Sequence, residues 1–264
     1  MRFHAFQHDV IHNEWEANRL MIETQFAESE VRQGDFVVLP EMTDTGWSMD
    51  IDKIADNGSV NWAMGLASKF GIWIQIGWAT KKGAKGQNCV SICSPGGESV
   101  GSYIKNFTCN PISENQFYEC GDELIVIDTG HCRICPLICY DLRFPELWRP
   151  AAIKGVDVFT LSSSWPIARI QHWEGLLIGR AIENQAAIVA ANRCGKDKTA
   201  HWGGKSMIVL PNGETVAIAS EIDANVLLSD IDIDEIRNLR QSFPVFNDIK
   251  EELIGNINVQ TIYA

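Results

Sequence analysis

Short runs of consecutive apolar residues recur along the whole chain, and each run has the length of a β-strand. Many are apolar at consecutive rather than alternate positions, which is typical of strands that are covered on both faces. The pattern predicts ten strands, at residues 36–39, 73–78, 89–94, 124–127, 134–139, 156–161, 186–191, 206–210, 216–219 and 226–231.

Longer segments between these runs have apolar residues at helical spacing. The first of them carries Trp15, Leu20, Ile22 and Phe26, which predicts one buried helix face. Four helices are expected in all: 14–32, ending at Gly34; 60–70, with Gly71 as its C-cap; 146–154, ending at Gly155; and 168–185.

Hairpins and helix-linked strands occur together in this chain. Residues 95–97 (Pro-Gly-Gly) and 211–213 (Pro-Asn-Gly) are typical of hairpin turns. The combination predicts a layered α/β (α+β) protein with mixed sheets. Ten strands are many for one open sheet, so we expect two stacked sheets with helices outside. No Ser-, Gly- or Pro-rich linker divides the chain, which indicates a single domain over residues 1–264.

The composition indicates a globular protein with a sizeable core, because 45% of the 264 residues are hydrophobic and 21% are charged. With 22 basic and 34 acidic side chains the formal net charge is −12. That charge argues against nucleic acid and anionic membranes as partners. We see neither an export signal nor an apolar stretch of about 18 residues, so we expect a cytoplasmic protein with its eight cysteines reduced.

Cys139 is the first candidate for chemistry. It ends the apolar run 134–138 and precedes a polar turn at 140–146, where a helix begins. A thiol at such a strand-to-helix elbow is well placed as a nucleophile, and the backbone N–H groups that follow can stabilise an oxyanion. The alternative is that Cys139 is a small buried hydrophobic residue.

Two charged residues occupy similar positions. Glu41 follows the run 36–40, although a carboxylate there could instead cap a helix or lie on the surface. Lys105 follows the run 100–104, and its alternative is an ordinary solvated lysine. A lysine close to a carboxylate and a thiol would favour the charged form of both and lower the pKa of each.

The remaining thiols suggest a zinc or redox site only weakly. Cys132 and Cys135 lie at a strand start, where an odd separation points them to opposite faces, and no turn surrounds Cys89 and Cys93. We therefore expect no metal. His172, on the last predicted helix, is expected to be packed rather than to act as a ligand or base. Nucleotide-binding, metalloprotease and serine-hydrolase motifs are absent from the sequence.

Taken together, Glu41, Lys105 and Cys139 resemble the Glu–Lys–Cys triad of the nitrilase, or carbon–nitrogen hydrolase, superfamily. Each ends a separate strand, in the chain order of that triad. The resemblance spans roughly residues 3–247. The segments that carry it are Gln7 and Asp9, Trp15 and Asn18, 38–42 (Val-Leu-Pro-Glu-Met), 138–147 (Ile-Cys-Tyr-Asp-Leu-Arg-Phe-Pro-Glu-Leu), 180–185 (Arg-Ala-Ile-Glu-Asn-Gln), Asn192-Arg193, and Gly204, Ser206, Pro211 and Gly213.

The resemblance implies a four-layer α-β-β-α sandwich and hydrolysis of an amide without a metal or organic cofactor. In such an enzyme Glu41 is the general base, Cys139 the nucleophile, and Lys105 with the backbone N–H of Tyr140 the oxyanion donors. Glu114, seven residues before Gly121, matches the family's second glutamate, which orients the lysine. The family also implies a homodimer or a higher homo-oligomer, with residues 247–264 as a C-terminal tail at the interface.

Further details resemble the omega-amidase branch, whose substrates are short ω-monoamides of dicarboxylates such as 2-oxoglutaramate and 2-oxosuccinamate. The matching residues are Ser164-Trp165-Pro166, Arg169, His172-Trp173 and Phe243-Pro244. The resemblance implies that Arg143 and Arg169 are candidates to bind the substrate carboxylate, with a structural ion pair as the alternative. Trp165 would form a pocket wall, or belong to the core.

One segment departs from the family, which commonly has x-His-Leu-Phe after the lysine, where this chain has Asn106-Phe107-Thr108-Cys109. This departure affects the expected identity of the substrate more than the expected reaction, because the loop lines the pocket. An N-carbamoyl-amide hydrolase, a deaminated-glutathione amidase or a nitrilase would use the same triad with a different small-molecule substrate and water. A non-catalytic binding protein on the same fold is the alternative of another class.

Overall fold

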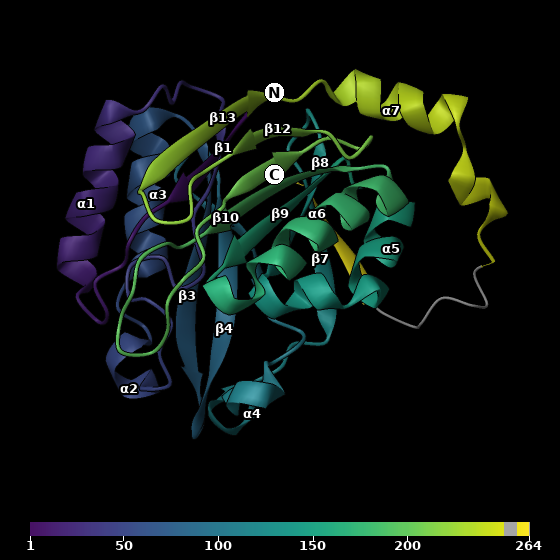
Figure 1. Ribbon diagram of the computed structural model, residues 1–264. Coiled ribbons are helices and arrows are strands. Elements are labelled where there is room, and N and C mark those ends of the chain that lie inside the picture. The colour runs from purple at the N-terminus through teal and green to yellow at the C-terminus, as the bar shows by residue number, and fades with distance from the viewer. Residues whose placement is uncertain (251–257, 264) are drawn as a thin grey trace.

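Two mixed β-sheets face each other in the computed structural model, which describes residues 1–250 and 258–263 (Figure 1). Within these residues each sheet has seven strands. The first has the order β13 (Asn225–Asp230), β1 (Arg2–Gln7), β2 (Phe36–Val38), β3 (Trp73–Lys82), β4 (Lys85–Cys93), β5 (Ser99–Ile104), with β6 (Tyr118–Glu119) paired to β4. The second has the order β12 (Thr215–Ile218), β11 (Met207–Val209), β10 (Ala187–Asn192), β9 (Val158–Ser163), β8 (Arg133–Ile138), β7 (Glu123–Asp128), β14 (Asn258–Tyr263).

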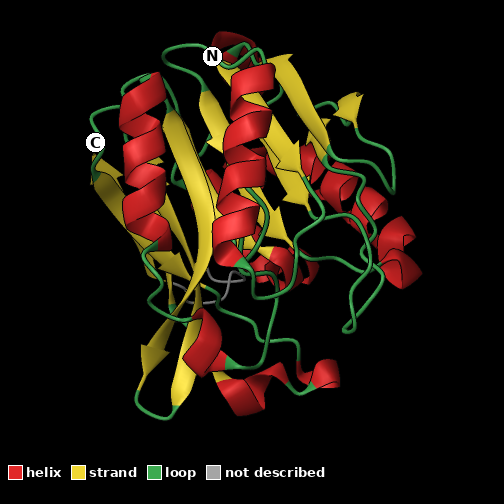
Figure 2. Ribbon diagram, turned by 90° about the vertical axis from the view of Figure 1, so that its left-hand side faces the viewer, coloured by secondary structure: helices red, strands yellow, loops and turns green. Residues whose placement is uncertain are grey.

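Helices cover both outer faces, so the predicted four-layer α-β-β-α sandwich is confirmed. In Figure 2 the helices α1 (Trp15–Glu28) and α3 (Ser59–Phe70) lie next to each other over the first sheet. The helices α5 (Pro145–Ile153) and α6 (Ile170–Asn184) cover the second sheet (Figure 1). The other α-helices of the described residues are α2 (Ile51–Ile54), α4 (Glu114–Phe117) and α7 (Ile233–Ser242), and the 3-10 helices are η1 (Asn110–Ile112), η2 (Cys139–Arg143), η3 (Ile167–Arg169) and η4 (Val245–Asp248).

The core follows the layers. Its largest part lies between the two sheets and beneath α5 and α6, where side chains such as Phe36, Leu137 and Trp148 are fully buried. A second cluster fills the space beneath α1 and α3, around Phe26 and Leu66. Among the described residues, no helix combines the length and hydrophobicity that crossing a bilayer requires.

All ten predicted strands overlap observed ones, but the first predicted helix is too long. Ser29 is extended, with ψ of 167°, and α1 therefore ends at Glu28 rather than at residue 32. Gly34, with φ of +86°, instead forms the turn into β2. The expected apolar face was also partly wrong, because Leu20 is 69% exposed, and the buried residues of α1 include the polar Asn18.

The other predicted helices agree with the structure more closely. Gly71 ends α3 in the left-handed region as expected, and Gln185 ends α6 in the same way with φ of +44°. The helix α7 was not predicted, because it is strongly polar and buries only Ile233 and Ile236. Its start was nevertheless readable in the sequence, since the Asp232 carboxylate caps the helix by accepting from two backbone N–H groups.

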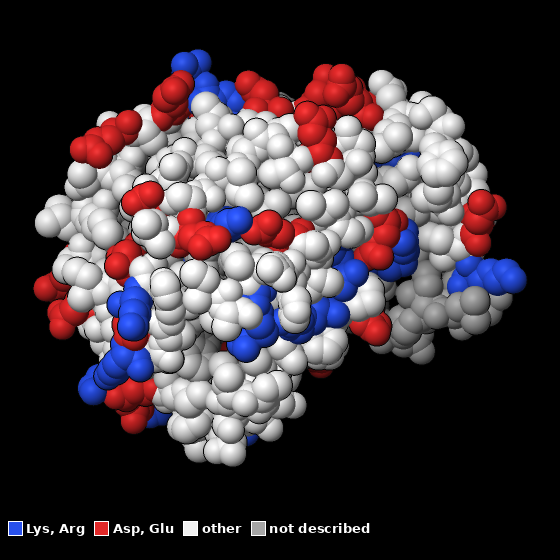
Figure 3. All heavy atoms as spheres, in the orientation of Figure 1, with Lys and Arg blue, Asp and Glu red and all other residues white. Residues whose placement is uncertain are grey.

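Acidic side chains gather near the start of α7 on the face shown in Figure 3, while the rest of that face carries both signs interspersed. The acidic residues of this segment are exposed.

A polar bridge crosses the apolar space between the sheets and fixes the end of β2. The Gln75 side chain on β3 donates to Ser162 Oγ at 2.9 Å and accepts from Thr160 Oγ1 at 2.5 Å, both on β9. Ser162 Oγ in turn donates to the backbone oxygen of Leu39 at 2.6 Å. Because buried polar groups need partners, this network sets the position of the segment that leads to Glu41.

Candidate active site

The four residues proposed for catalysis lie together in one cavity of about 690 Å³. Glu41 comes from the segment after β2, Lys105 from the segment after β5, Glu114 from α4 and Cys139 from the start of η2. Their chain positions are far apart, so only the packing of the two sheets brings them together.

Glu41 is only 1% exposed, and hydrogen bonds hold both of its carboxylate oxygens in place. Its Oε1 accepts from Asn88 Nδ2 at 2.7 Å and from Lys105 Nζ at 3.1 Å, and its Oε2 accepts from the backbone N of Ser164 at 2.9 Å. The next residue, Met42, has a left-handed backbone with φ of +46°, which turns the chain sharply at the strand end. These donors fix both carboxylate oxygens in the cavity.

Lys105 lies between two carboxylates. Its Nζ is 2.8 Å from Glu114 Oε1, 3.0 Å from Glu114 Oε2 and 3.1 Å from Glu41 Oε1. Burial alone lowers the pKa of a lysine, but the charges of Glu114 and Glu41 outweigh it and hold the pKa of Lys105 well above its usual range. The side chain is therefore an ammonium ion, available to stabilise negative charge.

Glu114 connects the lysine to the loop that departs from the family pattern. The backbone N–H of Cys109 donates to Glu114 Oε2 at 2.6 Å. Ser113, just before α4, has φ of +63°, which turns the chain so that Glu114 is fully buried. The altered loop therefore still binds the second glutamate through its backbone, whatever its side chains are.

Cys139 occupies a strained elbow and keeps part of its surface open to the cavity. Its φ of +44° is in the left-handed region, which is unfavourable for a residue with a Cβ. Burial, together with the charge of Glu41, raises the pKa of the Cys139 thiol well above its usual range, although Lys105, Ser163 and Ser164 act in the opposite direction. At neutral pH the sulfur therefore carries its proton, and the Glu41 carboxyl group lines the same cavity.

Asp141 ties this elbow to the lysine segment, and sequence reasoning missed it. Its Oδ2 accepts from the backbone N of Ile138 at 3.0 Å and from Tyr103 Oη at 2.8 Å, while its Oδ1 accepts from the backbone N of Phe107 at 3.0 Å. Complete burial raises the pKa of Asp141 to about 7, despite the opposing effect of Lys105 and these donors. The sequence feature that could have identified Asp141 is its position two residues after Cys139, in a segment that we had interpreted only as a turn.

The other end of the cavity combines aromatic and cationic side chains. The Arg143 guanidinium lies 4.6 Å from the ring centroid of Trp165 and 5.9 Å from that of Tyr140. Its two Nη atoms are 3.3 and 3.4 Å from Nδ1 of His172. Arg169 also lines the cavity and is exposed. Within the described residues neither arginine forms an ion pair with a carboxylate, so the structural ion pair that we kept as an alternative is not found there.

Trp165 lines the cavity and also belongs to the core, so both interpretations offered for it are correct. Its side chain is 2% exposed, and its Nε1 donates to the backbone oxygen of Arg169 at 2.7 Å.

The prediction that His172 is packed inside was wrong. His172 is exposed and lines the cavity, whereas its neighbour Trp173 is fully buried. Adjacent residues of a helix point about 100° apart, so a buried Trp173 leaves His172 at the edge of the buried face.

A loop that sequence reasoning did not single out completes the wall with Thr199, Ala200 and Trp202. Asp197 holds this loop, because its Oδ1 accepts from the backbone N of Thr199 at 2.7 Å and of Ala200 at 3.1 Å. Its Oδ2 accepts from Arg193 Nη1 at 2.9 Å and from Trp202 Nε1 at 3.1 Å. The fully buried Arg193 thus anchors one wall of the cavity.

The thiols considered for zinc are free and buried. Burial raises the pKa of both Cys89 and Cys93 to about 12, and that of Cys132 to about 11. Such thiols are poor metal ligands, because a ligand must be a thiolate. In the part of the chain that the structure describes, no three His, Cys, Asp or Glu side chains converge as a metal-binding set.

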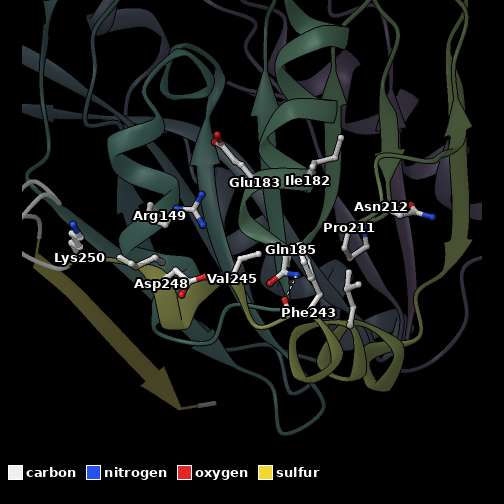
Figure 4. A pocket seen from close by; sticks show the side chains of 12 residues that line it. Arg149, Ile182, Glu183, Gln185, Pro211, Asn212, Phe243, Val245, Asp248 and Lys250 are labelled. Atoms are coloured by element: carbon white, nitrogen blue, oxygen red, sulfur yellow. Dashed lines mark hydrogen bonds between the residues drawn. The ribbon is translucent and has the colours of Figure 1, made fainter.

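A second cavity, of about 730 Å³, lies between the end of α6, α7 and the segment that follows it (Figure 4). Its lining is largely apolar and includes the exposed Ile182 and Phe243. Glu183 at its rim pairs with Arg180 at 2.9 Å, and Gln185 Nε2 donates to the backbone oxygen of Phe243 at 2.9 Å. Because no cysteine, serine or histidine is among the described residues that line this cavity, nucleophilic chemistry is assigned to the first one.

The sandwich and the cavity define a class of hydrolase that attacks carbon–nitrogen bonds, and comparison with known proteins agrees. The carbon–nitrogen hydrolase family model matches residues 14–241, and the chain belongs to this family. It is 33% identical over 233 residues to the 2-oxoglutaramate amidase of Bacillus subtilis (strain 168), covering 86% of this chain and 90% of the relative. It is 32% identical over 220 residues to omega-amidase YafV of Escherichia coli (strain K12), covering 82% and 85%.

The solved structures give the same fold. XC1258 from Xanthomonas campestris, described as a CN-hydrolase superfamily protein with an arsenic adduct in the active site, superposes with a TM-score of 0.89. The two chains are 26% identical, and the match covers 97% of this chain and 99% of that one.

Proposed function

We propose that the protein is a cysteine-dependent amidase that hydrolyses a short ω-amide of a dicarboxylate, of the 2-oxoglutaramate or 2-oxosuccinamate type, to the acid and ammonia. The observation that carries the substrate class is Arg143, whose guanidinium lies over the ring of Trp165, 4.6 Å from its centroid, without a carboxylate partner among the described residues. It lines the same cavity as Cys139, so one small molecule can reach both. The names of the relatives support the same class of substrate.

The first half of the proposed reaction forms a thioester. Glu41 takes the proton of the Cys139 thiol while the sulfur attacks the amide carbon, so that an S–C bond forms and the carbonyl π electrons move to oxygen. The Lys105 ammonium and the backbone N–H of Tyr140 donate to that oxyanion. As the C–N bond breaks, the nitrogen takes the proton from Glu41 and leaves as ammonia.

The second half releases the acid. A water molecule gives a proton to Glu41 while its oxygen attacks the thioester carbon, and the C–S bond then breaks with its electrons returning to sulfur. Glu41 finally returns the proton to Cys139. Throughout, Glu114 holds Lys105 in place and keeps it charged, so Glu41 is free to gain and lose a proton.

The substrate carboxylate is proposed to bind at the aromatic end of the cavity. The contact with His172 uses the two Nη atoms of Arg143, so the edge formed by Nε and one Nη remains for a carboxylate, which it can bind through two parallel hydrogen bonds. His172 holds Arg143 from one side. Arg169 is exposed and lines the same cavity, so its charge would attract the substrate carboxylate without holding it in one position.

The test is ammonia release from a panel that contains 2-oxoglutaramate, succinamate, glutamine, an N-carbamoyl amino acid, deaminated glutathione and a simple nitrile. Turnover of the first two, lost in Cys139→Ala with an unchanged circular dichroism spectrum, is the expected result. Preference for deaminated glutathione, the carbamoyl compound or the nitrile would replace the proposed substrate by one of the alternatives. A protein that hydrolyses none of them, or a Cys139→Ala variant with substantial activity, would refute the proposal.

We also propose that the protein is a cytoplasmic homodimer. The exposed apolar side chains Ile182 and Phe243, which line the second cavity, support a contact between copies (Figure 4). The eight free cysteines suit a reducing compartment. The predicted tail 247–264 lies partly outside the described residues, and its described strand β14 pairs with β7 of the same chain. Light scattering coupled to size-exclusion chromatography measures the assembly, and a monomer at micromolar concentration would contradict it.

A further inference from the structure

The hydroxyl of Ser163 is a buried polar group that the proposed mechanism leaves unexplained. Ser163 is the last residue of β9 and is fully buried, yet its Oγ has no hydrogen-bond partner within the described residues. A buried hydroxyl without a partner is costly, and such exceptions call for an explanation. Its backbone is fixed, since its carbonyl oxygen accepts from the N–H of Arg193 at 3.1 Å.

The pairing of two strands brings this hydroxyl to the nucleophile. The strands β8 and β9 are parallel, and their last paired residues are Ile138 and Ser162. Cys139 follows Ile138 directly at the start of η2, and Ser163 follows Ser162 as the last residue of β9, so the two residues lie at neighbouring strand ends. The hydroxyl is close enough to the sulfur to lower the pKa of the thiol. The backbone N–H of Ser164, which donates to Glu41 Oε2 at 2.9 Å, acts on the thiol in the same direction.

We propose that Ser163 is a further catalytic residue, whose hydroxyl donates to the Cys139 sulfur at the moment it becomes a thiolate. This proposal rests on the proposed function. A neutral thiol is a weak acceptor, which explains why the hydroxyl has no well-formed hydrogen bond within the described residues, whereas a thiolate is a strong acceptor. The Ser163 hydroxyl is thus already placed where negative charge develops on the Cys139 sulfur, so no reorganisation of the protein is needed when the thiolate forms.

The Ser164 N–H completes the arrangement. In the resting protein its acceptor is the Glu41 carboxylate. When the proton moves from Cys139 sulfur to Glu41, the carboxyl group becomes the poorer acceptor and the sulfur the better one. One backbone donor and one hydroxyl donor then face the thiolate, while the oxyanion of the substrate is left to Lys105 and Tyr140. No bond of Ser163 is made or broken in the reaction, and its proton stays on Oγ.

Other charged groups around the sulfur do not replace this hydroxyl. Glu41 and Lys105 face the thiol from the segments after β2 and β5, and Glu114 on α4 is bound to Lys105. On the turn of Cys139 itself, Asp141 is bound to Ile138 and Phe107, and Arg143 is stacked on Trp165; Arg169 lies at the mouth of the cavity. Lys105 is the one cation among these that acts on the sulfur, and the reaction needs it at the oxyanion.

The experiment measures thiolate formation without using an amide substrate of the enzyme. Iodoacetamide alkylates thiolates, so its rate of inactivation as a function of pH reports how readily Cys139 loses its proton. In Ser163→Ala we expect the inactivation rate at pH 7 and kcat/KM to fall roughly 10- to 100-fold, as for a hydrogen bond to a charged group. We expect kcat to carry the loss with KM little changed, and the alkylation profile to move to higher pH by roughly one unit.

A matched control removes a different buried hydroxyl. Ser91 on β4 accepts from Trp78 Nε1 at 2.8 Å and lies outside the cavity, so Ser91→Ala should reduce stability without changing the alkylation profile. If Ser163→Ala does not fold, the isosteric pair Ser163→Thr and Ser163→Val answers the same question, with activity kept in Thr and lost in Val.

An alkylation rate and pH profile in Ser163→Ala equal to those of the wild type would overturn the proposal. So would equal losses in the Thr and Val variants, which would assign Ser163 a packing role alone. Neither result touches the proposed function, whose failure shows as missing ammonia release by the unmodified protein.

Discussion

Asp141→Asn is predicted to change how the stability of the protein depends on pH. The folded protein raises the pKa of Asp141 from 3.8 to about 7. Because the raised value belongs to a carboxyl group, folding favours the protonated form. The stability that this proton contributes is fully present below about pH 4 and is lost as the pH rises through about 7.

The magnitude follows from the size of the shift. A change of about three pKa units corresponds to about 4 kcal/mol at about 1.4 kcal/mol per unit. This figure is an upper bound for the part of the stability change between about pH 4 and 8 that comes from Asp141 alone. Asparagine does not titrate, so the variant lacks this part of the pH dependence.

The substitution also has a cost that does not depend on pH. The carboxylate accepts from Ile138 and Tyr103 on Oδ2 and from Phe107 on Oδ1. An asparagine can accept through one atom only, so in its best orientation the amide NH₂ faces the Phe107 N–H. One buried donor without an acceptor costs about 1–3 kcal/mol. The variant is therefore less stable than the wild type at pH 5, and the difference shrinks as the pH rises.

Urea unfolding of both proteins at pH 5, 6, 7 and 8 measures this difference directly. All other titrating groups are shared, so they cancel in the comparison. Tyr103→Phe is the control, because it removes one donor that lowers the pKa of Asp141 and should move the window to higher pH. Parallel stability curves for wild type and Asp141→Asn, or a gap that widens with pH, would refute the reasoning by showing that the donors keep Asp141 ionised.

Two further predictions concern the cavity. Arg143→Ala should raise KM for 2-oxoglutaramate roughly 10- to 100-fold with kcat little changed, as expected for a charge-assisted contact, while Arg169→Ala should act mainly at low salt. Ammonia release with butyramide, which lacks the carboxylate, checks this, and equal losses on both substrates would count against the assignment. Gly77→Ala should lower kcat by about tenfold or more, because its Cβ would lie 2.7 Å from Met42 N and Pro40 O and 2.9 Å from Glu41 Cα, all backbone atoms that cannot give way. Gly175→Ala, whose Cβ meets nothing within 4 Å, should leave activity unchanged, and a Gly77→Ala variant with normal kcat would show that Glu41 tolerates displacement.

The sequence predicted the strand ends well because apolar runs and the charged residues that follow them are local signals. Glu41, Lys105 and Cys139 each stand at such an end, and the structure places all three in one cavity. Asn88 and Ser163 could not be found in this way, because they lie within or at the close of buried strands and look like ordinary polar residues. Their significance depends on partners that lie far away along the chain.

The errors also have physical causes. The predicted helix 14–32 was longer than the observed one because helix propensity does not reveal where tertiary contacts end a helix. The position of His172 was predicted wrongly because helix periodicity locates a buried face but not its edge. The strand β14 gave no signal that distinguishes it from a tail. It becomes a strand because β7 offers it a free edge.

That edge has a consequence for how the protein is made. Every described residue that lines the proposed catalytic cavity precedes residue 203, whereas β14 comes from residues 258–263. A chain emerging from the ribosome can therefore complete its proposed catalytic centre while β7 still presents unpaired N–H and C=O groups beside buried apolar side chains. Such an edge is a template for pairing with another nascent chain. Synthesis that stops before β14 would thus yield a protein with all of its proposed catalytic residues and a strong tendency to self-associate.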